Sequence, residues 1–376
     1  MSDKAFDVVV IGAGVIGLAH AYTAASRGLK VAVVERHARA VGASIRNFGF
    51  VTVTGQQRGD FWNLTRRTRD IWADIAPKAG ITVQHRGLYM AVRRSQSVDL
   101  LKAFLQTEMG EGCALLSPSE VPGLAGPELL AVLHSPHEVR VESRDAIPAL
   151  ADWMARDLGV TFFWSTEVTH VETGHVVTAR GELKAGQVFV CPGDDAGGLF
   201  AQTLQDRAVS RCKLQMLRLA DPGFRLPGAV MSDLGLVRYL GYADLPEADA
   251  VRAVLKAEQA EHLDNGVHLI VVQSGDGSLV VGDSHHYHAT PDPFGHTHVD
   301  ALILDEYRQV MGEPPAVLER WTGTYAVSPQ GLWFHDTVCP GVHLVMVTCG
   351  AGASSAFGIA ERVVGQALEM QNEKVA

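Results

Sequence analysis

The feature of this sequence that most constrains its fold lies within residues 6–35. A short β-branched run, FDVVVI at 6–11, is followed by GAGVIG and by a helix-like stretch that ends at Gly28. A second apolar run, KVAVVE, then ends in Glu35. Runs of this kind and length are typical of buried parallel strands. The order of strand, glycine turn, helix and strand therefore predicts a βαβ unit.

The glycines of this unit have the spacing of a dinucleotide-binding turn. Gly12 permits the tight turn, Gly14 lets the backbone approach a pyrophosphate, and Gly17 lets the helix pack close to the sheet. The helix N-terminus offers free N–H groups to the phosphates, and Glu35 can accept hydrogen bonds from the ribose hydroxyls. A βαβ unit with coincidental glycines is the alternative. The predicted nucleotide contacts are Gly12, Gly14, Val15, Ile16, Gly17, Glu35 and Arg36.

Composition excludes several classes of partner. With 376 residues the chain is long enough for two domains. The net charge of −10 argues against a general affinity for nucleic acid or anionic membranes. Outside the glycine-rich start, no stretch approaches the roughly 20 apolar residues of a membrane helix, so we expect no membrane insertion. Five cysteines without a CxxC pair fit a reducing cytosol and predict a cytoplasmic protein.

The segment after the second strand, GASIRNFGFVT at 42–52, resembles the D-amino-acid oxidase family of FAD enzymes, which includes glycine oxidase and sarcosine oxidase. In that family a small-Ser-x-x-Asn-x-Gly segment runs along the pyrophosphate and under the flavin ring. A polar surface loop is the alternative for this stretch alone. The resemblance implies that FAD is the cofactor and that its contacts include Ser44, Arg46, Asn47, Phe48 and Gly49.

Three later stretches are similar to the same family. STEVTHV at 165–171 resembles the strand beside the adenine, and VFVCPG at 188–193 resembles the strand and turn that close the nucleotide site. HLVMVTCGAGASSAFGIAERV at 343–363 resembles a strand, turn and helix whose N-terminus stabilises the anionic reduced flavin. An ordinary glycine-rich turn is the alternative for the last stretch. The contacts implied are Glu167, Val168, Cys191, Gly193, Gly350, Gly352, Ala353, Ser354 and Ser355.

This resemblance spans most of the chain and implies an α/β fold. A Rossmann-type FAD-binding domain would be interleaved with an α+β substrate domain built on an antiparallel sheet. Strand-like runs at 214–219, 268–273 and 278–282 support that sheet. The expected segments are 1–85, 141–205 and 320–376 for the FAD-binding domain, and 86–140 and 206–319 for the substrate domain.

The chain departs from the family at positions that decide the substrate and the cofactor link. Amino-acid-oxidising members carry an arginine that pairs with the substrate carboxylate, whereas WTGTYAVSP at 321–329 has Tyr325 there. Sarcosine oxidase-like members have a cysteine for the covalent flavin link, and Gly323 in its place predicts non-covalent FAD. They also have an oxygen-activating lysine where this chain has Val280. The electron acceptor, O₂ or another, therefore stays open.

A run of histidines follows Val280 in the stretch GDSHHYHATPD. Histidine clusters bind metals, but no ligand spacing with carboxylates or thiolates emerges here, so we predict no metal. Surface or packing positions are the expected fate of most of these histidines. One or two of His285 and His286 are expected to face the substrate.

These departures, with the RNFGF segment, resemble a branch of the family associated with phosphonate degradation. The substrate expected from that resemblance is an aminoalkylphosphonate, such as 2-aminoethylphosphonate or its N-methyl form. A tetrahedral anion suits several separate donors better than one planar fork. The predicted catalytic residues are Tyr325, His286 and His285. The predicted substrate-binding residues are Arg46, Arg238, Tyr239, His285, His286 and Tyr325.

The predicted reaction moves a hydride from the carbon beside the amine nitrogen to FAD N5, and water then hydrolyses the imine. A pocket that binds the neutral amine needs no strong general base, because burial lowers an amine's pKa. Three alternatives remain: a D-amino-acid, glycine or sarcosine-type oxidase, an NAD-dependent dehydrogenase, and a nucleotide-binding protein without enzymatic activity.

Overall fold

The two apolar runs around the glycine turn form neighbouring strands in the structure, a computed structural model that describes residues 5–375. β1 (Ala5–Ile11) and β2 (Val31–Val34) pair in parallel, and α1 (Val15–Ala25) connects them. Val8 and Val10 contribute to the core on the helical side of this sheet, and Val9 contributes to the core on the other side. Both faces are therefore covered, which is why the strand is apolar throughout.

The first sheet has eight strands and carries the β1–α1–β2 unit near its centre. β10 and β2 flank β1 in parallel, and β18 pairs with β10 in parallel. The path of the sheet is β17 (Trp333–Cys339), β18 (Val342–Val347), β10 (Gly181–Val190), β1, β2 and β7 (Thr161–Phe163). Off this path, β9 (His175–Thr178) pairs with β10, and β8 (Val168–Glu172) pairs with β9.

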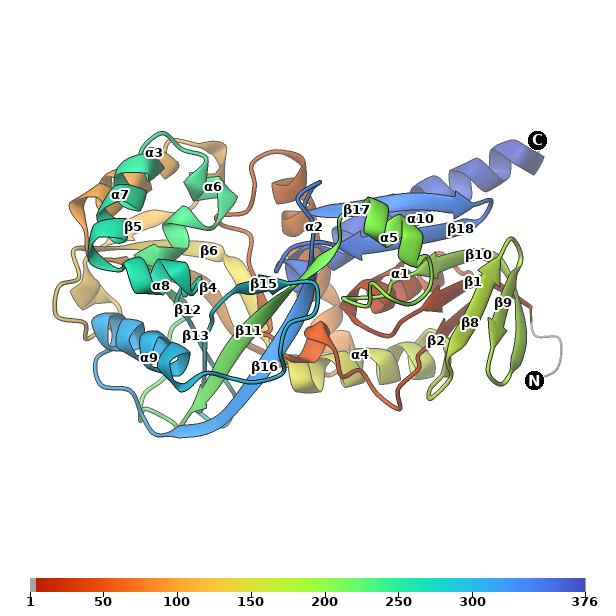
Figure 1. Ribbon diagram of the computed structural model, residues 1–376, viewed down its shortest axis with the longest axis horizontal. Coiled ribbons are helices and arrows are strands. Elements are labelled where there is room, and N and C mark those ends of the chain that lie inside the picture. Colours follow the sequence, from red (N-terminus) through yellow and green to blue (C-terminus); the bar gives the residue numbers. More distant parts are fainter. Residues whose placement is uncertain (1–4, 376) are drawn as a thin grey trace.

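Four helices pack in the hydrophobic core on one side of this sheet. α10 contacts both α1 and α2, so it joins the end of the described chain to its beginning. In Figure 1 the sheet and its helices form the right-hand lobe, and both termini lie at its outer end. The helices of this lobe are α1, α2 (Asp60–Lys78), α4 (Ser143–Asp157), α10 (Gly352–Val375) and the short α5 (Ala201–Asp206).

The second sheet has ten strands and forms the core of the other lobe. Its central pairs β11·β14 and β13·β14 are antiparallel, which confirms the three strand-like runs read from the sequence. Its path is β15 (His286–His288), β11 (Ser210–Leu219), β14 (Leu279–Gly282), β13 (Ile270–Gln273), β12 (Ala229–Ser232), β4 (Val83–Val92), β6 (Ala131–Val141) and β3 (Phe50–Val51), with β16 (Val317–Val327) on β11 and β5 (Ala114–Leu116) on β6.

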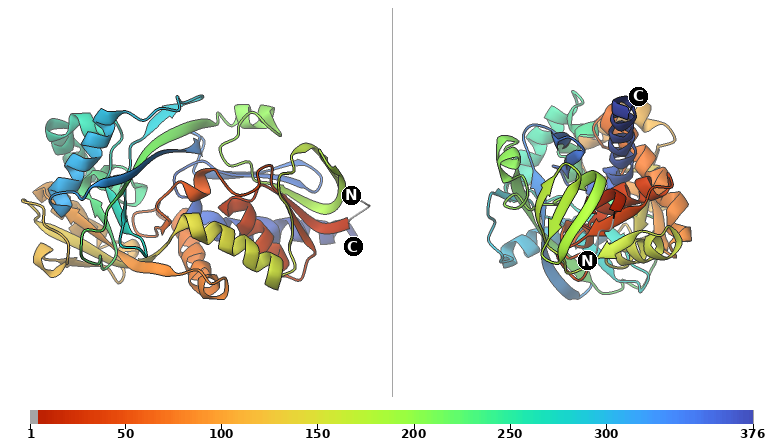
Figure 2. Two further views of the ribbon diagram at one scale, coloured as in Figure 1. Left: turned by 90° about the horizontal axis from the view of Figure 1, so that it is seen from below. Right: turned by 90° about the vertical axis from the view of Figure 1, so that its right-hand side faces the viewer.

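This second sheet is mixed rather than wholly antiparallel, because β12 pairs with β4 in parallel. Figure 2 shows the two lobes from below and along the long axis. The helical segments on this side of the molecule are α3 (Ser95–Phe104), α6 (Leu240–Ala243), α7 (Ala248–Glu258), α8 (Ala260–Asp264) and α9 (Thr297–Met311), with 3₁₀ turns η2 (Glu108–Gly110), η3 (Pro118–Glu120) and η4 (Asp233–Val237).

The chain crosses between the two sheets several times. β16 pairs along its whole length with β11 of the second sheet. We therefore propose the two-domain division expected from the sequence, with its last boundary moved from residue 320 to the end of β16. Among the described residues, no helix combines the length and apolar character that crossing a membrane requires.

Candidate active site

The glycine turn after β1 is held in a conformation that side chains would prevent. Gly12 has a φ of +104°, and a Cβ there would lie 2.4 Å from the carbonyl oxygen of Cys191. A Cβ on Gly17 would lie 1.9 Å from the carbonyl oxygen of Gly12. Gly14 caps α1 without a side-chain hydrogen bond. The turn therefore presents backbone N–H groups, as a phosphate site requires.

Glu35 follows β2 and lies against this turn. Its carboxylate accepts hydrogen bonds from the N–H of Ala13 at 2.9 Å and from the N–H of His37 at 2.9 Å. A carboxylate has about four acceptor sites, so lone pairs remain for ribose hydroxyls. The N–H of Thr166 donates to the Glu35 carbonyl, so the segment of Glu167 and Val168 runs beside the acid.

The segment 42–49 crosses the front of α1. Its 3₁₀ turn η1 (Ala43–Ile45) carries Ser44, whose hydroxyl accepts a hydrogen bond from the N–H of Val15 at 2.9 Å. The Asn47 side chain donates to the Ala43 carbonyl and accepts from the N–H of Gly49. Asn47 therefore lines the site but uses its side chain to hold the turn rather than to reach outward.

The second glycine-rich turn lies between β18 and α10. The Ser354 hydroxyl accepts a hydrogen bond from the N–H of Thr52 at 2.8 Å, which ties the start of α10 to the strand end after β3. The Ser355 hydroxyl donates back to the Ala351 carbonyl, and the residue is fully buried. The free N–H groups at the start of α10 carry the positive end of its dipole.

A cavity of about 470 Å³ lies between the two lobes and joins these parts. One wall is formed by the start of α1, the 42–49 segment and the turn before α10, and the other by the second sheet and the residues 238–240 that follow η4. The predicted cofactor residues that line it are Val15, Ile16, Ser44, Arg46, Asn47, Phe48, Gly193, Gly350, Gly352, Ala353 and Ser354.

The wall from the second lobe is rich in hydrogen-bonding groups. Arg238, directly after η4, donates to the hydroxyls of Tyr287 at 3.2 Å and Tyr325 at 3.3 Å. A Cβ on Gly350 would lie 3.5 Å from the Tyr325 hydroxyl, so this group faces the turn before α10. Burial raises the pKa of Tyr325 well above its usual range, so the phenol stays protonated.

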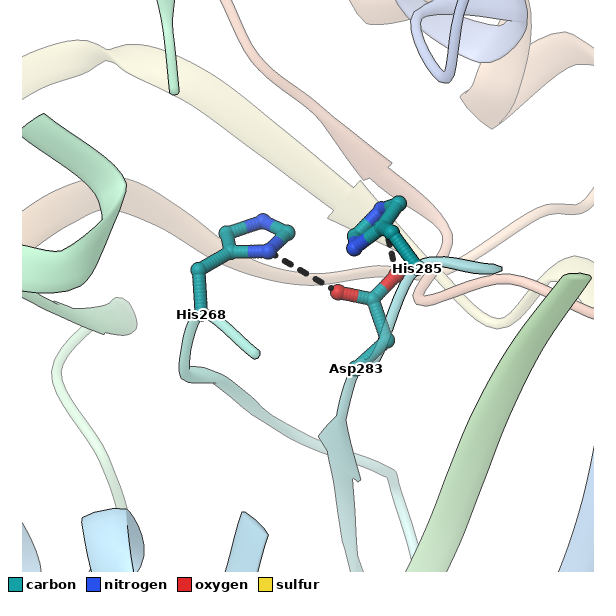
Figure 3. A group of neighbouring side chains, drawn as sticks. All are labelled: His268, Asp283 and His285. Carbon is teal, nitrogen blue, oxygen red and sulfur yellow. Dashed lines mark ion pairs between the residues drawn. The ribbon is translucent and has the colours of Figure 1, made fainter. Parts of the chain in front are cut away.

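His268, Asp283 and His285 form a buried cluster in the same wall (Figure 3). Nδ1 of His268 lies 3.2 Å from one carboxylate oxygen of Asp283, and Nε2 of His285 lies 3.6 Å from the other. Burial raises the pKa of Asp283 to about 7, against the opposing effect of the Arg238 charge. Burial lowers the pKa of both histidines well below the usual range, and Arg238 adds to this.

The structure separates the two neighbouring histidines that were expected to face the substrate. His285 lines the cavity, whereas His286 does not and contacts the side-chain oxygen of Asn265 at 3.1 Å. Alternation along an extended segment explains this, because adjacent side chains point to opposite sides. We therefore assign no substrate role to His286. Ser355 likewise does not line the cavity, and its hydroxyl donates to the carbonyl of Ala351, just before α10.

Other predicted cofactor residues lie beside the cavity rather than on its lining. Gly12, Gly14, Gly17, Glu35, Gly49, Glu167 and Val168 belong to the nucleotide end described above. The exposed Arg36 pairs with Asp195 at 2.5 Å. Cys191 is buried with its thiol pKa raised by burial, so its contribution there is its backbone. The substrate residues that line the cavity are Arg46, Arg238, Tyr239, His285 and Tyr325.

His268 and Asp283 were not predicted from the sequence as residues of the site. Asp283 directly follows β14, and His268 precedes β13, the antiparallel neighbour of β14. The two residues exchange backbone hydrogen bonds at 3.2 and 3.0 Å, so they face each other at the end of the ladder. The available signal was a histidine and a carboxylate at the adjoining ends of two predicted strands.

These residues fit FAD. The glycine turn that a Cβ would fill, the N-terminus of α1 and the carboxylate of Glu35 together match a nucleotide with two phosphates and a ribose. Gly323, at the position of the family's covalent link, offers no thiol. The Cys349 thiol also lines the cavity, but burial raises its pKa to about 11, so it is a poor nucleophile at neutral pH.

Comparison with known proteins agrees with this arrangement. Residues 7–366 match the family described as "DAO: FAD dependent oxidoreductase". The chain is 26% identical over 244 residues to glycine oxidase from Bacillus licheniformis, an alignment that spans 61% of this chain and 65% of that protein. The chain thus spans less than two thirds of the length of that curated relative.

Solved structures show the same fold. The crystal structure of glycine oxidase from Geobacillus kaustophilus superposes with a TM-score of 0.77 at 19% identity, covering 98% of this chain and 95% of that one. A dithionite-reduced L-α-glycerophosphate oxidase from Mycoplasma pneumoniae with FAD bound gives a TM-score of 0.71 at 18% identity, covering 98% of this chain and 95% of that one.

Proposed function

The chain belongs to the DAO family of FAD-dependent oxidoreductases, and from that premise we propose that it oxidises a small amine at the carbon beside nitrogen. The observation that carries the proposal is the wall opposite the α10 turn. It combines a guanidinium, Arg238, with a carboxylate, Asp283, in one cavity. A substrate with both an anionic group and an amine matches these two charges.

One similarity and the chemistry of the cofactor support an amine as the substrate. The glycine oxidase from Bacillus licheniformis is named for the oxidation of an amine-bearing acid. FAD, when bound, accepts a hydride from carbon, which turns a C–N single bond into an imine that water hydrolyses. The protein's part is to bind and orient the amine and to exclude water from it.

We further propose that the anionic group of the substrate is a phosphonate, as in 2-aminoethylphosphonate or its N-methyl form. The Arg238 guanidinium lies within hydrogen-bond distance of the hydroxyls of Tyr287 and Tyr325, so the cavity offers three separate donor groups rather than one planar fork. Such a set suits a tetrahedral anion. The fold also accommodates a substrate with a phosphoryl group, because L-α-glycerophosphate oxidase shares it.

An amino acid with a carboxylate is the second candidate. Arg238 is itself able to hold a carboxylate, even though it comes from a different element than the family's arginine. With an amino acid as the substrate, the reaction is the same and only the anionic group of the substrate differs. It makes the chain a glycine, sarcosine or D-amino-acid type of oxidase, in line with the glycine oxidases that it resembles.

The test is an anaerobic titration of the purified, FAD-loaded protein with matched amines. 2-Aminoethylphosphonate and β-alanine have the same amine and the same two-carbon chain, and they differ only in the anion. N-methyl-2-aminoethylphosphonate and sarcosine extend the comparison to secondary amines. We expect the phosphonates to bleach the flavin at concentrations at least about tenfold lower than their carboxylate counterparts, a difference of roughly 1.4 kcal/mol in binding.

Each result separates the proposals. Stronger bleaching by β-alanine, glycine or sarcosine would replace the phosphonate with a carboxylate. Flavin that no amine bleaches, in protein that retains its yellow colour, would contradict amine oxidation altogether.

A further inference from the structure

In the His268–Asp283–His285 cluster, a ring nitrogen and a carboxylate face each other without a hydrogen between them. Nδ1 of His285 lies 2.8 Å from the carbonyl oxygen of Gly266, which only accepts, so Nδ1 carries the hydrogen. The other nitrogen, Nε2, then offers a lone pair toward the Asp283 carboxylate 3.6 Å away. Two acceptors that face each other in a buried site call for a proton between them.

Several atoms of the cluster also lack a hydrogen-bond partner among the described residues. These are both ring nitrogens of His268 and the Asp283 oxygen that faces it. His268 and Asp283 are 3% and 4% exposed as whole residues, and both line the cavity. Buried polar atoms without partners are uncommon, and at a cavity wall they indicate a ligand that supplies the missing donors.

The charges of the groups around Asp283 are compatible with the binding of one more cation. Arg238 is the one cation among the groups that face it, since burial lowers the pKa of both histidines. Burial also keeps the other two groups neutral, raising the pKa of Cys212 to about 11 and that of Tyr239 above its usual range. The facing groups, taken from every element packed around Asp283, are Arg238, Tyr239, Cys212, His268 and His285.

We propose that Asp283 accepts the proton that the substrate's ammonium group must lose before oxidation, while His268 and His285 position the carboxylate. This inference rests on the proposed amine oxidation. An N–H bond of the ammonium breaks, an O–H bond forms on Asp283, and the electron pair stays on nitrogen as the lone pair. That lone pair then becomes the second C–N bond when a hydride leaves the adjacent carbon for FAD, which is the oxidant. The substrate's anion would bind at Arg238.

The sequence predicted a pocket that binds the amine in its neutral form and needs no strong base. A base at Asp283 departs from that prediction. The carboxyl pKa of about 7 suits a base at neutral pH, because a proton acceptor works best when its pKa is near that of the medium. The two imidazoles flank the two carboxylate oxygens, Nδ1 of His268 at 3.2 Å and Nε2 of His285 at 3.6 Å (Figure 3). Once Asp283 holds the proton, its O–H can donate to the lone pair of Nε2.

A divalent metal ion is the competing occupant of the cluster. The three side chains each offer one donor atom, and these atoms lie within 4.8 Å of one another. Two features favour the ammonium instead. The carboxylate divides its two oxygens between the two imidazoles, and the Arg238 guanidinium opposes a dication nearby.

The test compares FAD-loaded wild type, Asp283→Asn and Asp264→Asn, an exposed aspartate on α8 that serves as the control. Flavin reduction by the best amine is followed anaerobically by stopped flow from pH 6 to pH 10. We expect Asp283→Asn to be about 100-fold slower than wild type at pH 7. Its rate should then rise about tenfold per pH unit toward the wild-type rate, because an alkylammonium with a pKa of roughly 10 loses its own proton in base.

A second measurement does not depend on turnover. The dithionite-reduced protein binds the amine but does not oxidise it. The buried pocket is expected to lower the pKa of the bound amine below that of Asp283. At pH 8 the infrared difference spectrum on binding should therefore gain a band of a protonated carboxyl group, and Asp283→Asn should lack that band. FAD content and thermal unfolding of each variant show that the site is intact.

The outcomes are distinct. If Asp283→Asn slows flavin reduction by the same factor at every pH, or does not slow it at any pH, Asp283 is not the base. A stoichiometric metal in purified wild type, with activity lost to a chelator and restored by that metal, would overturn it in favour of a metal site. If no amine reduces the wild-type flavin, the failure belongs to the proposed function and removes the premise of this inference.

Discussion

Arg238 donates a hydrogen bond to the hydroxyl of Tyr325 over 3.3 Å. Tyr325 stands on β16, where related amino-acid oxidases are expected to carry the arginine that holds the substrate. Arg238 arrives from the end of η4, a different part of the chain, and places its guanidinium beside that position. The positive charge that position 325 lacks is thus present in the cavity, and substrate selection is expected to depend on it.

Replacing Arg238 should weaken substrate binding far more than it affects the flavin. Arg238→Lys keeps the charge but loses the planar donors, and Arg238→Met loses both. We expect the apparent dissociation constant to rise about tenfold for the first and about 100-fold for the second, which corresponds to losing a buried charge-assisted contact of roughly 3 kcal/mol. Anaerobic titration measures this, with Arg252→Met on α7 as the exposed control. Equal affinities would remove Arg238 from the substrate site.

Two adjacent histidines provide a matched pair of variants. His285→Gln should slow flavin reduction about tenfold, because its side chain lines the cavity and positions Asp283. His286→Gln should leave the rate within about twofold, because its side chain lies on the other side of the segment beside Asn265. Stopped-flow reduction under saturating amine compares them. A larger effect at position 286 would mean that the segment is turned the other way during catalysis.

The glycine turn should tolerate no side chain. A Cβ on Gly17 would meet the Gly12 carbonyl at 1.9 Å, so Gly17→Ala should yield protein with little bound FAD and a lower melting temperature. Gly42→Ala is the matched control, since a Cβ there meets nothing within 4 Å and its φ is −86°. Absorbance of the purified proteins at the flavin band gives the ratio of cofactor to chain. A fully loaded Gly17→Ala protein would contradict the close approach of helix and strand.

Asp283 should make stability depend on pH in a defined direction. Its folded pKa of about 7 lies above the value of about 3.9 for an unfolded aspartate. The stabilisation that Asp283 contributes to the free energy of unfolding is therefore fully present below pH 4. It is lost as the pH rises to 7, at about 1.4 kcal/mol per pH unit. The two histidines act oppositely below about pH 6.5, so the difference between Asp283→Asn and wild type isolates the carboxyl group. Urea unfolding at pH 5 and pH 7 should show the variant gaining relative stability at pH 7.

FAD should leave the protein on acid precipitation. Gly323 provides no thiol, and the high pKa of Cys349 disfavours attack on the flavin. We expect all the yellow colour in the supernatant, for wild type and for Cys349→Ser alike. Colour retained in the wild-type pellet and absent from the Cys349→Ser pellet would reveal a covalent bond at Cys349.

Much of the fold follows from local sequence patterns. The β1–α1–β2 unit could be predicted because its glycines, apolar runs and Glu35 are close together in the chain. The pairing of β12 with β4 could not, because nothing in the run Ala229–Ser232 indicates a parallel neighbour more than a hundred residues earlier. Strand direction in such a sheet depends on how the whole chain is connected.

The active site, like the fold, is predictable where its residues lie in one contiguous motif and unpredictable where distant strands bring them together. Residues in contiguous motifs, such as Ser44 and Gly350, line the cavity as expected. His268 and Asp283 meet only because β13 and β14 pair in one register, and a shift by one residue would have turned the same side chains away. His285 and His286 looked equivalent in the sequence, and only the course of the backbone after β14 distinguishes them.

The order of the strands also has a consequence for biosynthesis. β1 and α1 leave the ribosome well before β18, which pairs with β10 in the same sheet, and before α10, which packs against α1. Until then the nascent chain exposes the edge of β10 that β18 later covers, as well as the apolar face that α10 later packs against. Such contacts between distant segments form slowly and leave partly folded chains prone to aggregate. Cellular yield should therefore respond to chaperone supply during translation, and to flavin supply only once α10 has emerged.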